Sequence, residues 1–385
     1  MHKIYLDYAA TTPADPQVAE AMQPYFFEKF GNASSPHKTG QEAKKAIENA
    51  RETSARFIGA KSEELIFTSG GTESNNQAVF GVAHALQSKG NHIIISRIEH
   101  HSVTEAAHQL EKEGCRISYI GVDKTGLIDP AEVKKAVTDK TILISIMHAN
   151  NEIGTIQPIQ EVGKIAREKG IYFHCDAVQT VGHIPVDVAE MQVDLLSLAG
   201  HKFYGPKGVG ALYVRKGIKI APFLFGGDQE RGRRASTHNL PGIVGLGKAS
   251  ELCREKMAQE AKTQSILRDK IISTVTKRIS DSFLNGHPND RLPNNVNFSF
   301  TGIEGESLLM SLDMVGVAVS MGSACTSGAL EPSYVLRAIG RSDELALGSI
   351  RITLGRWTTE KDINYFLEQL ISIVERLRSL SSTHK

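Results

Sequence analysis

The alternation of short apolar runs with helix-like segments between His92 and Cys175 restricts the fold of this chain more than any other feature. The apolar runs are rich in β-branched residues, and the segments between them have helical periodicity. The expected strands are 92–96, 116–122, 142–147 and 171–175, and the expected helices between them are 103–113, 130–137 and 159–169. This alternation predicts an α/β fold, a mostly parallel, doubly wound sheet with helices on both faces.

The segments on either side of this region divide the chain further. Before it we expect a strand at 4–6, helices at 17–30 and 41–57, and a strand at 66–67. After it, a long helix at 243–279 marks a change of domain. The remainder has α+β character, with strands at 295–300, 317–320 and 350–353 and helices at 305–314 and 361–380. We therefore predict a large domain of residues 15–255 and a small domain formed by residues 1–14 and 256–385.

Charge and cysteine content exclude several classes of protein. The 385 residues include 44 basic and 43 acidic side chains, so no net field favours nucleic acid or an anionic membrane. The four cysteines form no CxxC pair, which argues against a zinc site or a disulfide framework and for a reducing compartment. The N-terminus lacks the apolar core of a signal peptide, and the longest apolar runs are too short to cross a bilayer. We expect a soluble, cytoplasmic protein.

The stretch from Asp194 to Val214 contains the first candidate for chemistry. Its two apolar runs, 195–198 and 209–214, are typical of buried strands, and Lys202 lies between them among glycines. A loop lysine is commonly just solvated. Lys202, however, follows a strand end, where ligands gather in open α/β sheets. A partly desolvated lysine there has a lowered pKa and can form a Schiff base with an aldehyde.

The segment TSGGTESNN, residues 68–76, follows a short strand and begins a helix. The free backbone N–H groups and the positive dipole end of such a helix make a site for a phosphate. The glycine pair Gly70–Gly71 is weak evidence alone, because any tight turn uses glycine. Thr72 is either a helix cap or a phosphate ligand, and the two roles are compatible.

Three further predicted strands end in polar residues that a simple core does not require. Asp176 follows the strand at 171–175 and is suited to keep a pyridine nitrogen protonated, with helix capping as the alternative. His100 or its neighbour His101 could stack on such a ring, and the sequence leaves the choice open. Gln179 and Asn151 could hydrogen-bond a ring hydroxyl or a substrate carboxylate.

The second half of the chain adds a thiol and several arginines. Cys325 lies in MGSACTSGALEPS, residues 321–333, whose small and polar residues are typical of a loop rather than a core. Arg351, in a strand-like segment, could bind a carboxylate through its planar fork. The basic segment 225–242 is either solvated or reaches across a subunit boundary to a neighbour's anion site.

Together these residues resemble the group I cysteine desulfurases of the NifS/IscS type, class-V aminotransferases with the fold-type-I architecture of pyridoxal-phosphate enzymes. The resemblance covers essentially the whole chain. It is carried by the motifs YLDYAATTP, TSGGTESNN, EHHSV, NNEIGTIQPI, HCDAVQ, GHKFYGPKG, GSACTSG and SIRITLGR. It implies an enzyme that converts L-cysteine to L-alanine. It also implies that the large domain binds pyridoxal 5'-phosphate and that the small domain carries the catalytic cysteine.

The resemblance also implies a role for each matching residue. Lys202 would bind the cofactor covalently, Cys325 would receive the sulfur as a persulfide, and His100 would stack on the ring and assist proton transfer. The other implied contacts are the pyridine nitrogen with Asp176, the ring hydroxyl with Gln179, the phosphate with Gly71, Thr72 and His201, the phosphate of the other subunit with Thr237, and the substrate carboxylate with Asn151 and Arg351. The implied partners are a second copy in a homodimer and a sulfur acceptor for iron–sulfur cluster assembly or tRNA thiolation. Direct nucleic-acid and membrane binding are not implied.

One residue of this chain departs from the family pattern, and two alternative functions remain open. The family usually has Ser-Ala or Ser-Gly before His-Lys, whereas this chain has Ala199-Gly200, so a hydroxyl for the phosphate is absent. We expect weaker cofactor retention rather than inactivity. A class-V aminotransferase or selenocysteine lyase on the same scaffold is one alternative, which the presence of Cys325 opposes. A non-catalytic sulfur-relay or assembly partner is the other, which the full set of Lys202, Asp176, His100 and Cys325 opposes.

Overall fold

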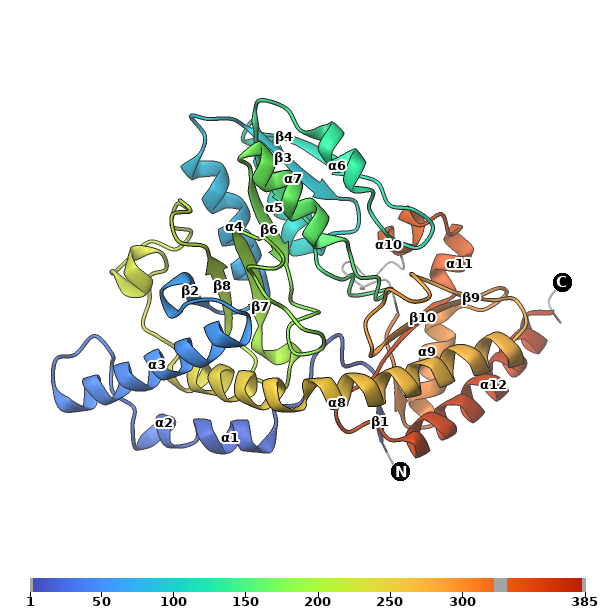
Figure 1. Ribbon diagram of the computed structural model, residues 1–385. Coiled ribbons are helices and arrows are strands. Elements are labelled where there is room, and N and C mark those ends of the chain that lie inside the picture. The colour runs from blue at the N-terminus through green and yellow to red at the C-terminus, as the bar shows by residue number, and fades with distance from the viewer. Residues whose placement is uncertain (1–2, 322–330, 383–385) are drawn as a thin grey trace.

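The computed structural model describes residues 3–321 and 331–382, and its centre is a seven-stranded sheet (Figure 1). The spatial order of the strands is β2-β8-β7-β6-β5-β3-β4. Their bounds are β2 Leu65–Thr68, β3 His92–Ser96, β4 Arg116–Ile120, β5 Thr141–Ser145, β6 Tyr172–Asp176, β7 Leu195–Ala199 and β8 Gly210–Val214. Only β8 runs antiparallel to its neighbours β2 and β7. The prediction of a mostly parallel sheet is confirmed.

Helices cover both faces of this sheet, so its strands are buried on both sides. The helices of this part are α1 Pro16–Met22, α2 Pro24–Phe27, α3 Lys38–Phe57, α4 Gly71–Ala85, α5 His101–Lys112, α6 Pro130–Ala136 and α7 Ile159–Lys169. Successive residues of one strand join different apolar clusters: Ile94 belongs to one, and Ile93 and Ile95 to the other. Successive side chains of a strand point to opposite faces of the sheet, and both faces are buried here. This is why the strands appear as continuous apolar runs in the sequence.

The N-terminal helix prediction was partly wrong. The expected helix at 17–30 is two short helices, α1 and α2, with Pro24 at the first position of the second. Proline lacks an N–H and clashes with the preceding turn, so it starts a new helix instead of continuing the old one. The antiparallel direction of β8 was not predicted, because a buried apolar run carries no sign of its direction.

A second, smaller body contains its own sheets and apolar cluster. Its antiparallel sheet has the order β12-β10-β9, and β1 pairs in parallel with β11. The bounds are β1 Ile4–Tyr5, β9 Ser282–Leu284, β10 Asn295–Phe300, β11 Val317–Ala318, β12 Ser349–Thr353, α9 Gly305–Met314, α10 Tyr334–Ala338, α11 Asp343–Leu347 and α12 Glu360–Ser382. The strand β9 was missed, because a three-residue strand carries too little pattern.

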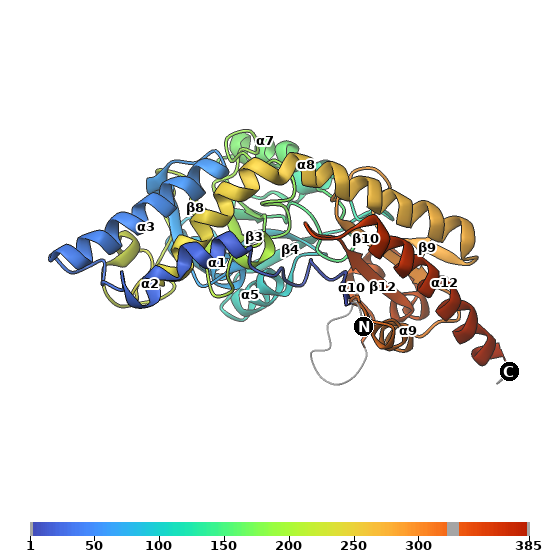
Figure 2. The same cartoon turned by 90° about the horizontal axis from the view of Figure 1, so that it is seen from below.

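Helix α8, Leu240–Arg278, runs along both bodies (Figures 1 and 2). Leu246 and Leu252 in its first half belong to a cluster of the large sheet, whereas Leu267 and Val275 belong to the cluster of the smaller body. The domain boundary predicted after residue 255 therefore lies inside one continuous helix.

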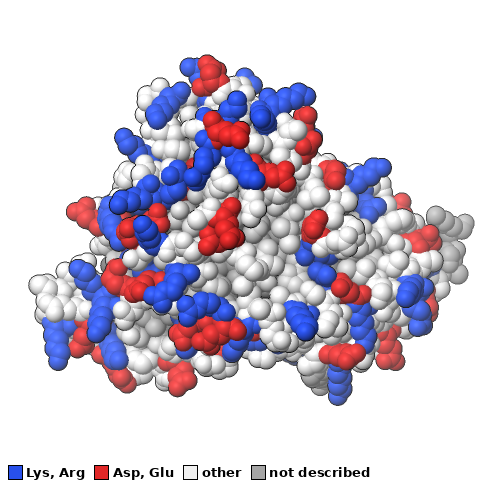
Figure 3. Space-filling model, viewed as in Figure 1, with Lys and Arg blue, Asp and Glu red and all other residues white. Residues whose placement is uncertain are grey.

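The surface and the remaining short elements complete the description. Basic and acidic side chains are interspersed on the face shown in Figure 3. Within residues 3–321 and 331–382, no helix has the length and apolar content needed to span a membrane. Short 3₁₀ helices lie at η1 Ser62–Glu64, η2 Gly200–Lys202 and η3 Gln229–Gly232.

Candidate active site

A cavity of about 320 Å³ lies at the carboxyl ends of the sheet strands. This is where open α/β sheets bind ligands. Nine of the predicted site residues line the cavity: Gly71, Thr72, His100, Asn151, Asp176, Gln179, His201, Lys202 and Arg351. All but Arg351 come from strand ends and helix starts of the large sheet. Arg351 comes from β12 of the smaller body, so the cavity spans the two bodies.

Lys202 lies in η2, directly after β7, and its amine is held in the cavity by backbone carbonyls. Its Nζ donates hydrogen bonds to the oxygens of Ala9, at 2.6 Å, and Ala10, at 2.9 Å. Burial, with a smaller contribution from the charge of Arg351, lowers the pKa of Lys202 to about 8, although Asp176 and Asp7 oppose the shift. A substantial fraction of this amine is therefore uncharged and nucleophilic at mildly alkaline pH.

Asp176 is a buried carboxylate at the end of β6. Its Oδ1 accepts a hydrogen bond from the backbone N–H of Val178, at 2.9 Å, and its Oδ2 accepts one from Asn75 Nδ2, at 2.7 Å. Among the residues that the structure describes, none forms an ion pair with it within 4.0 Å. A buried anion without a counter-ion is costly. A protonated pyridine nitrogen in the cavity would supply the missing charge, so this wall fits the ring of pyridoxal phosphate.

The structure resolves the choice between the two adjacent histidines. His100 lines the cavity, whereas His101 does not and instead packs its ring against Tyr334, at 5.0 Å between centroids. Nδ1 of His100 accepts the backbone N–H of Ser102, at 3.1 Å, so the neutral ring carries its proton on Nε2. Burial lowers the pKa of His100, and the charge of Asp176 opposes this. His100 is therefore neutral at pH 7.

The start of α4 forms the phosphate end of the cavity. The cap residue is Gly70 and no side chain caps this end, so Thr72 is not the helix cap. A Cβ at Gly71 would lie 2.7 Å from Cγ2 of Val178, which explains the need for glycine there. The same Cβ would lie 3.7 Å from Cβ of Ala199, the position where the family has serine. The uncapped N–H groups and the dipole of a 15-residue helix fit a phosphate.

The opposite side of the cavity presents buried polar groups, among them the donors of Arg351, which are suited to a carboxylate. Arg351 donates from Nη1 to the backbone oxygen of Asn151, at 3.0 Å, and from Nη2 to Oδ1 of Asp7, at 2.9 Å. The Nε of Arg351 and the Oδ1 of Asn151 are buried and have no hydrogen-bond partner among the described residues. Gln179 donates from Nε2 to the oxygen of Ala9, at 3.0 Å. Unsatisfied buried groups of this kind are suited to a polar ligand.

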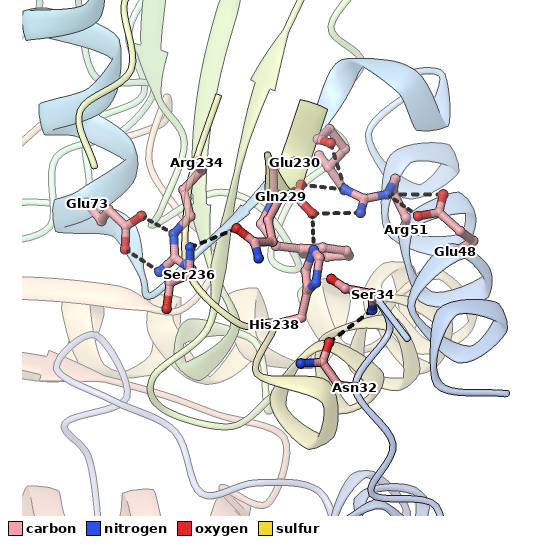
Figure 4. A network of polar contacts seen from close by, with 12 residues as sticks. Asn32, Ser34, Glu48, Arg51, Glu73, Gln229, Glu230, Arg234, Ser236 and His238 are labelled. Atoms are coloured by element: carbon pink, nitrogen blue, oxygen red, sulfur yellow. Dashed lines mark hydrogen bonds and ion pairs between the residues drawn. The ribbon is translucent and has the colours of Figure 1, made fainter. Parts of the chain in front are cut away.

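Thr237 does not line this cavity within a single chain. It is exposed, and it lies on a segment that a polar network fastens to the large sheet (Figure 4). The carboxylate of Glu230 accepts two hydrogen bonds from the guanidinium of Arg51, at 2.6 and 2.7 Å, and one from His238 Nε2, at 2.7 Å. A few residues on, Arg234 pairs with Glu73 in the first turn of α4, at 2.8 Å. The segment around Thr237 is thus fixed to the phosphate end of the site.

Cys325 lies outside the described residues, so its predicted role is untested. The residues that flank the gap, Met321 and Glu331, line a second cavity of about 920 Å³. This cavity shares His100, Asn151 and Arg351 with the first one. The chain that carries Cys325 therefore leaves and re-enters the described structure beside the candidate site.

Several cavity residues were missed in the sequence. They are Ala9 and Ala10 in the N-terminal segment, Asn75 on α4 and Ser102 on α5. Asp7, which contacts the cavity residue Arg351, was also missed. The motif YLDYAATTP contributes to the family resemblance, but none of its residues was assigned a role. Asn75 follows Gly71 by one helical turn, so it lies on the same side of α4, and this spacing could have identified it.

Comparisons with known proteins agree with this geometry. The family described as aminotransferase class-V matches residues 4–366. A cysteine desulfurase IscS of Dictyoglomus turgidum is 61% identical over 379 residues, which cover 98% of this chain and 96% of the relative. A cysteine desulfurase IscS of Methanosarcina thermophila is 53% identical over 98% of this chain and 93% of its own length.

Solved structures give the same result. A NifS-like protein superposes with a TM-score of 0.92 at 38% identity, covering 97% of this chain and all of the other. A structure of SspA in complex with cysteine has a TM-score of 0.82 at 36% identity, covering 93% of this chain and all of the other.

The chain therefore belongs to the class-V aminotransferase family, whose enzymes of this fold use pyridoxal phosphate. Within that family it groups with the cysteine desulfurases of the IscS and NifS type.

Proposed function

We propose that the protein is a pyridoxal-phosphate-dependent cysteine desulfurase that releases L-alanine from L-cysteine and transfers the sulfur to Cys325. One observation carries the proposal: a single cavity combines the lysine amine of lowered pKa, the buried Asp176 carboxylate, an open helix start and the Arg351 guanidinium. Among the described residues, the carboxylate has no ion-pair partner and the Nε of Arg351 has no hydrogen-bond partner. When bound, the cofactor supplies an aldehyde and a protonated ring that withdraws electrons.

We assign cofactor binding, substrate binding and proton transfer to different residues of the chain. Asp176 would keep the ring nitrogen protonated, and the start of α4 with Thr72 and His201 would hold the phosphate. Arg351 and Asn151 bind the substrate carboxylate and so orient the amine and the thiol of cysteine. Lys202 and His100, which both line the cavity, would accept and return protons at the reacting carbons.

Sulfur transfer is assigned to Cys325. Its thiolate attacks the substrate sulfur, the carbon–sulfur bond breaks, and the products are alanine and a Cys325 persulfide. Cys325 is four residues beyond Met321 in the sequence. Met321 lines the cavity that contains His100 and Arg351, and this supports the assignment.

Two copies of the chain are proposed to form the working enzyme. Exposed aromatic side chains occur in two regions: Phe26 and Phe27 on α2 with Phe30 after it, and Phe225 before the Thr237 segment. Residues 33–34 and 228–231 line a common surface pocket, so these two regions are adjacent. A second copy over this patch would bury apolar surface and bring its phosphate end near Thr237. The sulfur acceptor is proposed to be an iron–sulfur scaffold or a tRNA-thiolation protein.

The test combines product analysis with site mapping. Borohydride reduction of the cofactor-loaded protein should place the label on Lys202, and incubation with L-cysteine should release alanine and sulfide. Cys325→Ala should abolish persulfide formation and turnover. Continued release of sulfur by Cys325→Ala, or a label on another lysine, would overturn the proposal, and transamination by Cys325→Ala would favour an aminotransferase.

A further inference from the structure

Asp7 lies against the guanidinium that is proposed to bind the substrate. Its Oδ1 is 2.9 Å from Nη2 of Arg351, and the two side chains are 19% and 9% exposed. The backbone on both sides of the contact is fixed. Asp7 forms a bridge with Thr353 on β12, and the N–H of Thr353 donates to the oxygen of Leu6, at 2.8 Å. The pair is therefore built into strand pairing and is not a chance surface contact.

The remaining donors of Arg351 show that this pairing is incomplete. Nη1 donates to the backbone oxygen of Asn151, whereas the buried Nε finds no partner among the described residues. A guanidinium presents five N–H donors in a rigid fork. Arg351 therefore already has one anionic partner while it keeps a buried donor free at the wall of the cavity.

We propose that Asp7 is an internal counter-ion of Arg351 that competes with the substrate carboxylate and limits the affinity of the site for amino acids. The inference rests on the proposed function, in which Arg351 binds that carboxylate. An incoming carboxylate must displace Asp7 from the guanidinium or share the guanidinium with it. Displacement breaks an existing charge-assisted hydrogen bond, and sharing brings two like charges together. Both routes weaken binding, so the sign of the effect does not depend on which occurs.

Weaker binding of the carboxylate helps turnover, because it speeds the release of the product. The carboxylate is present in cysteine and in alanine, so a contact with it holds substrate and product alike. Such uniform binding lowers KM without raising kcat, and it slows the release of alanine. Asp7 keeps Arg351 oriented while it reduces this retention.

The experiment compares two ligands that differ only by the carboxylate, L-alanine and ethylamine. Their dissociation constants are measured on the cofactor-loaded protein by calorimetry and by the absorbance of the bound cofactor. In Asp7→Asn the amide oxygen still accepts from Nη2, but the charge is gone. We expect L-alanine to bind on the order of tenfold more tightly, the scale of one partly screened charge pair, and ethylamine to bind unchanged. Asp7→Ser, which also removes the charge, carries the same expectation if Asp7→Asn fails to fold.

Two further variants separate the possible failures. Asp269→Asn removes one aspartate that pairs with Arg268 on α8, outside the cavity. It should leave the dissociation constants of both ligands unchanged. Arg351→Ala should weaken the binding of L-alanine but not that of ethylamine. Unchanged or weaker L-alanine binding in Asp7→Asn and Asp7→Ser overturns the inference, because a merely structural role would not tighten the site. Unchanged L-alanine binding in Arg351→Ala would instead refute the proposed carboxylate site.

Discussion

The cavity has two walls that satisfy their polar groups in different ways. The wall from the large sheet is completed by its own neighbours: Asn75 and the Val178 N–H hold Asp176, and Ser102 holds His100. The wall formed by the N-terminal segment 7–12 and β12 uses contacts that a ligand must replace. There, Asp7 holds the guanidinium of Arg351, and an incoming substrate carboxylate must displace Asp7 or share the guanidinium with it.

The difference matches the residence times of the two ligands. A cofactor that stays bound gains most from a wall that needs no rearrangement, since preorganised groups cost little when the ligand enters. A substrate that enters and leaves in each turnover is better served by a wall whose groups have substitute partners. The following predictions test whether the sheet wall is committed to the cofactor and the N-terminal wall to exchange.

The largest effect is expected at Asp176. Asp176→Ala removes the only carboxylate assigned to the ring nitrogen and would leave a buried charge on the bound cofactor unpaired. Breaking a buried pair in this way costs about 3–5 kcal/mol. Cofactor affinity and turnover should therefore fall by about 10²- to 10⁴-fold, as measured by equilibrium dialysis and by alanine release.

Asp176→Asn is the matched control, because it keeps the size of the side chain and removes its charge. It should be nearly as defective as Asp176→Ala. If Asp176→Asn were fully active, packing and not charge would account for the role of Asp176, and the comparison of the two walls would lose its main support.

The buried Glu230 should show how strongly the Thr237 segment is fixed to the sheet wall. Burial raises the pKa of this carboxyl, but hydrogen bonds from His238 and Arg51 outweigh it and lower the pKa from 4.5 to about 2. Because the folded-state pKa is depressed, the stabilisation is complete above about pH 4.5 and is lost as the pH falls towards 2. Its size is roughly 3 kcal/mol.

Unfolding by urea between pH 7 and pH 3 checks this value. Glu230→Gln should lose most of the stabilisation at pH 7 and should show a weaker dependence on acid than the wild type. Glu52→Gln, which breaks an exposed pair with Arg56 on the same helix as Arg51, should change stability by at most about 1 kcal/mol. Equal effects of the two substitutions would mean that the network does not hold the segment.

The sequence predicted the sheet wall far better than the N-terminal wall, for a physical reason. Strand–helix alternation places strand ends together, so Asp176, Lys202 and the start of α4 could be expected in one site from their order along the chain. The position of Asp7 could not be expected in this way. Its contact with Arg351 joins residues 344 positions apart and is set by a single parallel bridge between Asp7 and Thr353 on β12. A two-residue strand such as β1 leaves no periodicity from which this register can be inferred.

Ala199 tests whether the affinity of the sheet wall for pyridoxal phosphate can be increased. Its Cβ lies beside the start of α4, where a serine hydroxyl could donate to the phosphate. One charge-assisted hydrogen bond contributes about 1.5–3 kcal/mol. Ala199→Ser should therefore bind pyridoxal phosphate about 10- to 100-fold more tightly, by equilibrium dialysis, with little change in KM for cysteine. Equal affinity would show that another group already replaces the hydroxyl.

Tyr5 supplies the smallest test, on the N-terminal wall. Its hydroxyl lies 2.9 Å from the backbone oxygen of Asp7 and 3.0 Å from that of Thr11, so its one proton is shared between these two acceptors and links the two ends of the segment. Tyr5→Phe removes these contacts at a cost of about 0.5–1.5 kcal/mol. Because only the exchanging wall is loosened, KM for cysteine should change by up to about tenfold while cofactor affinity stays constant. Tyr365→Phe, which removes an exposed hydroxyl bonded to the oxygen of Val315, is the matched control and should change neither. If Tyr5→Phe lowered cofactor affinity as much as it altered KM, the two walls would act as one unit, and their division between resident and exchanging ligands would be wrong.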